Sequence, residues 1–242
     1  MASPNLVVHH LQIGQGERIP WLLEELGLPY KLELYKRSPL LSPPELQAKY
    51  PIGAAPLLED FTDPSNPIIL AESGAICEYI IRKYANGRLA LPPTHKNFSD
   101  YLYWFHFCNA TLMSHVFRRG LTRGCVGEDD PRYKGNDARV VIDLKHLDNR
   151  LLTTNAWLAG EDFTAADVMI GFCLTTMRKF EPIDLTEYKG ILGWLKRVGE
   201  RDAYRRAMKK SDPDLDIDAG LSAKGPEVIQ MGRKKGAQKQ KL

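Results

Sequence analysis

The sequence predicts a chain of two parts, an α/β unit followed by an all-α unit. Short apolar strands alternate with helical segments over the first 88 residues, which is typical of an α/β unit. A proline pair at residues 92–93 then marks a linker. From about residue 95 to residue 210 apolar side chains recur at helical spacing, so the second part is predicted to contain helices only.

The first half of the α/β unit contains two strands and two helices. Residues 6–11 form an apolar strand, and the apolar side chains of residues 17–26 follow the i, i+3, i+4, i+7 pattern of a helix face. Gly27 is suited to end that helix. Residues 30–35 alternate apolar and charged side chains, as a strand does, and a short helix follows at residues 44–49.

The second half of this unit begins with a hairpin. Residues 56–60 and 67–70 are apolar strands separated by the turn-forming residues 63–66, which predicts antiparallel pairing. The helix between the first two strands predicts that those strands are parallel. A last helix starts at Ser73. The resulting order, βαβαββα, is that of a thioredoxin-like domain.

The predicted domains are residues 1–88, thioredoxin-like, and residues 89–210, all-helical. Within the helical domain, Thr164 and Asp167 have the spacing of a capping box, which we interpret as structural. Residues 211–242 are rich in charges and poor in apolar side chains, so a disordered tail is predicted there.

Two short signals in the tail bear on location. The basic end is interpreted as a solvated tail, with nuclear localisation or RNA contact as the alternative. The last residues, Gln240-Lys241-Leu242, differ from the peroxisomal Ser-Lys-Leu signal at the first position. We expect a cytoplasmic protein, with the peroxisome as the alternative.

Composition excludes several classes of function. A net charge of +3 from 33 bases and 30 acids is too balanced to indicate a nucleic-acid partner. The sequence has no apolar run long enough to cross a membrane and no metal-ligand spacing. The four cysteines are scattered, which is typical of a reducing compartment.

Two chain features suggest a receptor for an α-amino acid. Pro56 opens a strand, where a missing N–H indicates a special turn that a cis bond would fit. Ser73 begins a helix, whose free N–H groups and dipole favour a carboxylate. Glu72 beside it is suited to bind an ammonium group.

With the segments 21–30, 34–37 and 43–46, these features resemble the glutathione transferase superfamily, most closely its fungal and bacterial branch. The resemblance covers roughly residues 5–210. It implies a cis Pro56, main-chain pairing of Ala55 with the cysteinyl part of glutathione, and a γ-glutamyl group held by Glu72 and Ser73. It also implies a basic contact from Arg18 and a homodimer.

The sequence departs from the family where glutathione is activated. Gly14 stands where a serine is common, and residues 11–18 contain no hydroxyl or thiol side chain. Backbone N–H groups with the amide of Gln15 or Gln12 are one way to bind the sulfur. A second possibility is that the protein binds glutathione but lowers the pKa of its thiol little, and a third is that it has lost glutathione chemistry. In the purely structural interpretation, Gly14-Gln15-Gly16 is only a tight turn between strand and helix.

A second departure lies near the predicted glycyl end of glutathione. Ala54 stands where the family often has a base. Lys49 or Arg18 is the candidate to replace that base.

The second substrate is expected against the helix near residues 96–120, where His106, Asn109 and Met113 share one face. The many aromatic side chains of that helix favour a dimer interface through residues 73–85 and 95–120.

The leading expectation is an enzyme that adds glutathione to a small electrophile. One alternative is a glutathione-dependent cis-trans isomerase, in which the thiolate adds to a conjugated double bond and leaves again. The other is a non-catalytic glutathione-binding or regulatory protein of the same fold, which Gly14 and Ala54 favour.

Overall fold

The computed structural model describes residues 3–38 and 41–229. Their N-terminal part contains a sheet of four strands in the order β2-β1-β3-β4. The strands are β1 (Leu6–Leu11), β2 (Lys31–Tyr35), β3 (Leu57–Asp60) and β4 (Ile68–Ala71). β1 pairs in parallel with β2, and β3 pairs antiparallel with both β1 and β4. The predicted thioredoxin-like arrangement and pairing directions are therefore confirmed.

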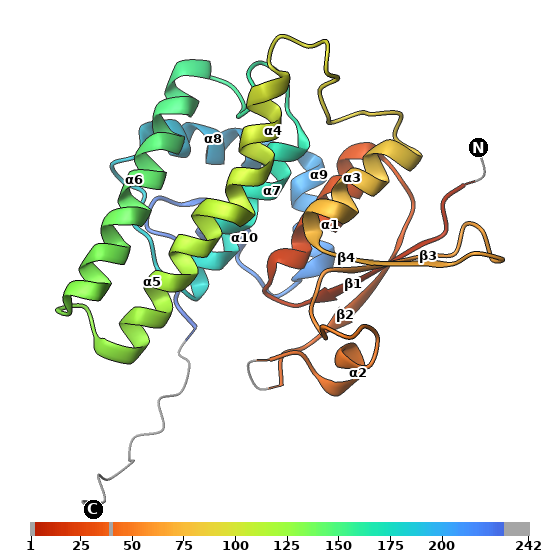
Figure 1. Cartoon of the computed structure of the whole chain (residues 1–242), viewed down its shortest axis with the longest axis horizontal. Coiled ribbons are helices and arrows are strands. Elements are labelled where there is room, and N and C mark those ends of the chain that lie inside the picture. Colours follow the sequence, from red (N-terminus) through yellow and green to blue (C-terminus); the bar gives the residue numbers. More distant parts are fainter. Residues whose placement is uncertain (1–2, 39–40, 230–242) are drawn as a thin grey trace, which may run out of the picture.

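Three helices accompany the sheet: α1 (Arg18–Leu26), α2 (Pro44–Gln47) and α3 (Ser73–Tyr84). Gly27 ends α1 with a φ of 66°, the left-handed conformation that glycine adopts most easily. Figure 1 shows α1 and α3 between the sheet and the helical part, whereas α2 lies away from the helical part. The helix start at Ser73 is thus close to the boundary between the two parts.

The C-terminal part consists of helices, as predicted. They are α4 (Phe98–Phe107), α5 (Met113–Val126), α6 (Pro131–Thr154), α7 (Ala165–Leu174), α8 (Lys189–Gly199), α9 (Asp202–Ser211) and α10 (Ile217–Leu221). A π-helical turn at Cys108–Leu112 joins α4 to α5. The capping box of Thr164 and Asp167 is present at the start of α7.

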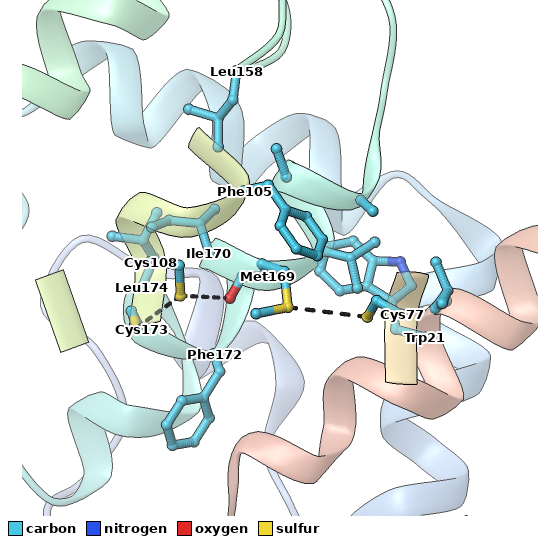
Figure 2. Packing of buried hydrophobic residues seen from close by; sticks show 14 of the residues in the cluster. Trp21, Cys77, Phe105, Cys108, Leu158, Met169, Ile170, Phe172, Cys173 and Leu174 are labelled. Carbon is cyan, nitrogen blue, oxygen red and sulfur yellow. Dashed lines mark hydrogen bonds between the residues drawn. The ribbon is translucent and has the colours of Figure 1, made fainter. Parts of the chain in front are cut away.

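The hydrophobic core joins the two parts. Trp21 of α1 packs edge-on against Tyr204 of α9, with ring centroids 4.9 Å apart. A Cβ at Gly171 would lie 2.5 Å from the Trp21 ring, so α7 can approach α1 only through a glycine. Figure 2 shows Trp21 beside Phe105 and Met169 in this core. Because α1 is buried on both sides, residues at its start are fixed by the helical part as well as by the sheet.

The prediction of a disordered tail is wrong for residues 211–229. The guanidinium of buried Arg178 donates hydrogen bonds to the backbone oxygens of Ser222 and Ala223, at 2.8 and 2.6 Å. The backbone N–H of Ile229 donates to the Lys179 oxygen at 2.8 Å. These bonds attach the polar segment to the helical part through its main chain. Hydropathy describes side chains only, so it gives no sign of such backbone hydrogen bonds.

The other predictions for the tail concern its basic end and Gln240-Lys241-Leu242, which lie outside the described residues. Within residues 3–38 and 41–229, none of the helices combines the length and the apolar character needed to cross a membrane.

Candidate functional site

The start of α3, at Glu72 and Ser73, is the first candidate for a binding site. Glu72 has a φ of 69°, a conformation that non-glycine residues seldom adopt and that often occurs at functional sites. Its side chain is exposed, and no hydrogen bond or ion pair joins it to another described residue. Ser73 beside it is only 2% exposed. The Ala55–Pro56 bond is cis, which confirms that prediction.

Arg18, expected to contact glutathione, instead lies behind Ser73 and is 0% exposed. Its Nη1 donates to Ser73 Oγ at 3.0 Å, to Gln15 Oε1 at 3.0 Å and to Asn109 Oδ1 at 2.9 Å. Arg18 therefore has no exposed surface in this structure through which to contact a ligand directly. The buried guanidinium orients three polar side chains around it.

These bonds determine how Ser73 can interact with a ligand. Its Oγ accepts from Arg18 Nη1 and also from Asn109 Nδ2, the latter at 3.3 Å. A hydroxyl has two acceptor lone pairs and one hydrogen to donate. With both lone pairs occupied, Ser73 has only its O–H to offer, which suits an acceptor such as a carboxylate.

Arg18 carries a buried positive charge without a carboxylate within 4.0 Å among the described residues. Its Nη2 donates to Cys108 Sγ at 2.9 Å. Burial alone would raise the pKa of the Cys108 thiol, but the hydrogen bond from Cys173 and the Arg18 charge bring it below its usual value. Figure 2 shows Cys108 directed at Cys173 and at the Met169 oxygen. The Cys108 thiol accepts from Arg18 and donates to the Met169 backbone oxygen at 2.9 Å, so it links the buried guanidinium to the main chain of α7.

A pocket of about 520 Å³ opens beside the loop that joins β1 to α1. Gly14, Gln15, Ala55 and Arg37 line it. A Cβ at Gly14 would lie 2.9 Å from the Leu11 backbone oxygen and 3.2 Å from Arg37 Nη2. No side chain fits there without displacing its neighbours, so glycine is required and a guanidinium occupies the adjacent space.

Arg37 and Asp212 both form hydrogen bonds with the backbone of this loop, and neither role was predicted from the sequence. Ile13, with a φ of 54°, accepts a hydrogen bond from Arg37 Nη2 at 2.6 Å. Its N–H donates to Asp212 Oδ1 at 2.7 Å. Arg37 follows β2 and Gly14 follows the parallel neighbour β1, so the shared sheet edge was a usable signal. Asp212 lay in the predicted tail and gave none.

The two glutamines of the loop differ in direction. Gln15 lines the pocket, and its Oε1 accepts from Arg18, which turns the amide nitrogen away from the guanidinium. Gln12 Nε2 instead donates to the Ser211 backbone oxygen at 3.4 Å. Of the two amides considered from the sequence, only that of Gln15 is placed to donate into the pocket.

The three residues predicted for the second-substrate face do not lie together in this structure. Met113 lines the pocket with Phe117, whereas His106 is exposed and outside it. Asn109 contacts Arg18 and Ser73 instead. The reason is the π-helical turn at Cys108–Leu112, which shifts the helix face by one residue and invalidates an i, i+3, i+7 pattern drawn across it.

The candidates for the missing base near Ala54 do not line the pocket either. Lys49 forms an ion pair with Glu59 at 3.6 Å, and Arg18 is buried. Ala54 does line the pocket, and the basic side chain in the lining of this pocket is that of Arg37. Among the described residues no group of histidine, cysteine or carboxylate side chains has the arrangement of a metal site.

Glu17, at the start of α1, is buried close to Asp212. Burial, with a contribution from the Asp212 charge, raises the pKa of the Glu17 carboxyl from the usual 4.5 to about 8. Between these two values the folded protein binds a proton that the unfolded chain has released. Stability must therefore fall as pH rises through this window and level off above pH 8.

Glu17→Gln should remove this pH dependence, because a glutamine stays neutral. Between pH 5.5 and pH 9 the wild type should lose about 3 kcal/mol of unfolding free energy relative to the variant. Urea unfolding at both pH values measures this, with the exposed Glu161→Gln as control. A constant difference between wild type and Glu17→Gln at both pH values would contradict the assignment.

Comparisons with known proteins agree with this geometry. Residues 15–88 match the glutathione S-transferase N-terminal domain family, and residues 125–202 match the glutathione S-transferase C-terminal domain family. Glutathione S-transferase 3 of Schizosaccharomyces pombe is 31% identical over 85% of this chain and 87% of its own length. The chain belongs to the glutathione S-transferase family.

Other members of the glutathione S-transferase family extend the likeness. Glutathione S-transferase 1 of Saccharomyces cerevisiae is 25% identical over 87% of this chain and 97% of its own. The crystal structure of a glutathione S-transferase from Actinobacillus pleuropneumoniae superposes with a TM-score of 0.73 at 28% identity, covering 90% of this chain and 95% of that one. A Phanerochaete chrysosporium glutathione transferase, solved with oxidized glutathione, shares the fold (TM-score 0.68, 21% identity, 85% and 95% covered).

Proposed function

We propose that this glutathione S-transferase family member adds glutathione to a small electrophile. The arrangement at Ser73 carries the proposal: with both lone pairs of its Oγ occupied, its side chain can only donate, and it stands at the N-terminus of α3. The α-carboxylate of the γ-glutamyl residue is the acceptor that fits. The unpaired carboxylate of Glu72 binds the ammonium group, and Ala55 pairs with the cysteinyl residue through its main chain.

Sulfur activation then uses the loop after β1. The backbone N–H groups around Gly14 and Gly16, the amide of Gln15 and the charge of Arg37 stabilise the thiolate. Support comes from the pocket lining, which brings Gly14, Gln15 and Arg37 together without any hydroxyl in the loop. Several weak donors replace the single serine, tyrosine or cysteine that the family commonly has.

Calorimetric titration with glutathione, followed by the ultraviolet thiolate absorbance of the complex, tests the proposal. The bound thiol should titrate well below the value of about 8.5 for a free thiol. Product analysis with a panel of electrophiles separates stable conjugates from isomerised substrate, which the isomerase alternative predicts. A thiol that titrates like free glutathione, with no turnover, would favour a binding or regulatory protein.

Gln15→Ala should lower turnover about three- to tenfold, because Arg37 and the backbone donors remain. Gln12→Ala is the matched control, since its amide is directed at Ser211, and it should leave turnover unchanged. Steady-state kinetics with one electrophile compare the two. Equal activity of wild type and Gln15→Ala would remove the Gln15 amide from the account.

We propose a cytoplasmic homodimer that acts in detoxification or secondary metabolism. The four cysteines are unpaired, which suits a reducing compartment. Most aromatic side chains of α4 are buried within the chain, but Tyr103 and Leu102 remain exposed for a partner copy. Light scattering at micromolar concentration should give the mass of a dimer.

A further inference from the structure

Ile13, the residue before Gly14, is held in a conformation that its side chain disfavours. Its φ is 54°, in the left-handed region, where a residue branched at Cβ is rarely found. Such a conformation persists only where neighbouring groups impose it. The groups that impose it here therefore also determine how the next three residues, Gly14 to Gly16, are placed in the wall of the pocket.

Asp212, which directly follows α9, contacts the loop at Ile13 and the preceding strand at His10. Its Oδ1 accepts from the Ile13 N–H at 2.7 Å, and its Oδ2 accepts from His10 Nε2 at 3.0 Å. Both side chains of this Asp212–His10 pair are buried. The backbone N–H of Asp212 donates to the Met208 oxygen at 2.8 Å, which fixes the carboxylate at the end of α9. One buried carboxylate thus joins α9 to two points of the segment that leads into the loop.

His10 extends this contact to the far end of the loop. A Cβ at Gly16 would lie 2.6 Å from His10 Nδ1, so the imidazole fills the space that a side chain at Gly16 would need. Asp212 therefore fixes Ile13 by a hydrogen bond and Gly16 by the packing of His10. The two residues between these points include the glutamine whose amide is placed to donate into the pocket.

The charge of Asp212 cannot itself favour a thiolate, because a nearby anion disfavours the ionisation of a thiol. Asp212 also does not line the pocket. The titratable and charged groups that face it are His10, Glu17, Arg37, Lys179 and Asp214. Any favourable effect of Asp212 on the sulfur must therefore come from the hydrogen bonds through which it shapes the loop.

We propose that Asp212 is a positioning residue for the activation of glutathione: it holds both ends of the loop so that the loop's donors face the sulfur. This inference rests on the proposed function, in which the donors of residues 14–16 stabilise the thiolate. The proposed γ-glutamyl contacts lie on a different element, α3. Loss of Asp212 should therefore impair ionisation of the bound thiol and leave the binding of protonated glutathione nearly unchanged.

Asp212→Ala tests the proposal through the ultraviolet titration of bound glutathione. Without the carboxylate, Ile13 can leave the left-handed region and the loop loses its alignment. The pKa of the bound thiol should rise by about one unit toward that of a free thiol, and kcat on the acid side of the titration should fall up to about tenfold. The affinity measured on that acid side should stay close to that of the wild type. A folded Asp212→Ala protein with the wild-type titration would overturn the proposal.

Two further variants are the controls. Asp214→Ala removes the same charge from an exposed side chain nearby and should titrate like wild type. Asp212→Asn offers one acceptor oxygen to two donors, and His10 cannot change tautomer at no cost, because its buried Nδ1 has no hydrogen-bond partner among the described residues. The bound thiol of Asp212→Asn should therefore titrate between wild type and Asp212→Ala. If the alanine variant does not fold, a wild-type titration in Asp212→Asn refutes the proposal instead.

Ile13→Gly supplies a readout that a merely structural role of Asp212 would not change. Glycine adopts a φ of 54° without strain, so the loop can keep its conformation when the bond from Asp212 is absent. Adding Ile13→Gly to Asp212→Ala should restore part of the lost kcat, although it restores no hydrogen bond. A double variant that is no more active than Asp212→Ala would contradict positioning through Ile13.

The outcomes separate the two proposals. If the wild type ionises bound glutathione and conjugates electrophiles, and the Asp212 variants do so equally well, the positioning role is refuted and the proposed function stands. If the wild type neither lowers the pKa of the bound thiol nor turns over any electrophile, the proposed function fails and the role of Asp212 fails with it.

Discussion

Arg18→Met should lower the affinity for glutathione about 30- to 150-fold and leave the protein folded. Arg18 lies behind Ser73, which separates it from the ligand by one hydroxyl. At about 6 Å and an effective dielectric constant of about 20, its charge contributes roughly 3 kcal/mol to a bound carboxylate. Methionine has a similar length and removes a buried charge that lacks a carboxylate partner, so the fold should tolerate it.

The controls for Arg18 separate charge from packing. Arg18→Lys keeps the charge but cannot donate to Ser73, Gln15 and Asn109 together, so its affinity should lie between wild type and Arg18→Met. The exposed Arg118→Met should bind like wild type. Calorimetry measures affinity, and circular dichroism melting confirms the fold. A folded Arg18→Met protein with wild-type affinity would remove Arg18 from the binding account.

Of the variants described here, Asp167→Ala should lose the most stability, about 3–6 kcal/mol in the free energy of unfolding. The buried carboxylate accepts from the backbone N–H of Leu158 at 3.1 Å, from that of Thr164 at 3.0 Å and from Trp194 Nε1 at 2.9 Å. Each buried donor left without an acceptor costs about 1–3 kcal/mol. The change should lower the melting temperature by about 10 °C.

Two further variants define this effect. Asp167→Asn keeps one acceptor oxygen and should lose less than the alanine variant. Asp162→Ala, nearby and exposed, should melt within about 2 °C of wild type. Denaturant unfolding gives the free energies. A loss below about 1 kcal/mol in Asp167→Ala would show that other groups satisfy the three donors.

The order of strands and helices could be predicted because each element has a local signal. The apolar spacing on α1, Gly27 at its end and the Thr164 capping box depend on residues within one or two turns of each other. Figure 1 shows the same order along the chain. Pairing directions followed from connection lengths, which are equally local.

The errors came from contacts that are distant in sequence. The segment after α9 looks disordered by composition, yet Arg178 binds its backbone from more than 40 positions away. His106 was misplaced because the π-helical turn at Cys108–Leu112 alters helix phase without a marked sequence signal. Arg18 was predicted to contact glutathione. Whether a basic side chain contacts a ligand or another side chain depends on how deeply it is buried, and the spacing of apolar residues along the sequence does not give the burial of Arg18.

The most direct test of the account is a cycle of two proteins and two ligands. Wild type and Ser73→Ala are each titrated with glutathione and with an analogue that lacks the α-carboxylate of the γ-glutamyl residue. If the Ser73 O–H binds that carboxylate, Ser73→Ala should cost about 1–3 kcal/mol, or about 5- to 150-fold in affinity, with glutathione and almost nothing with the analogue. Equal losses with both ligands, or unchanged affinity for glutathione in the folded variant, would contradict it.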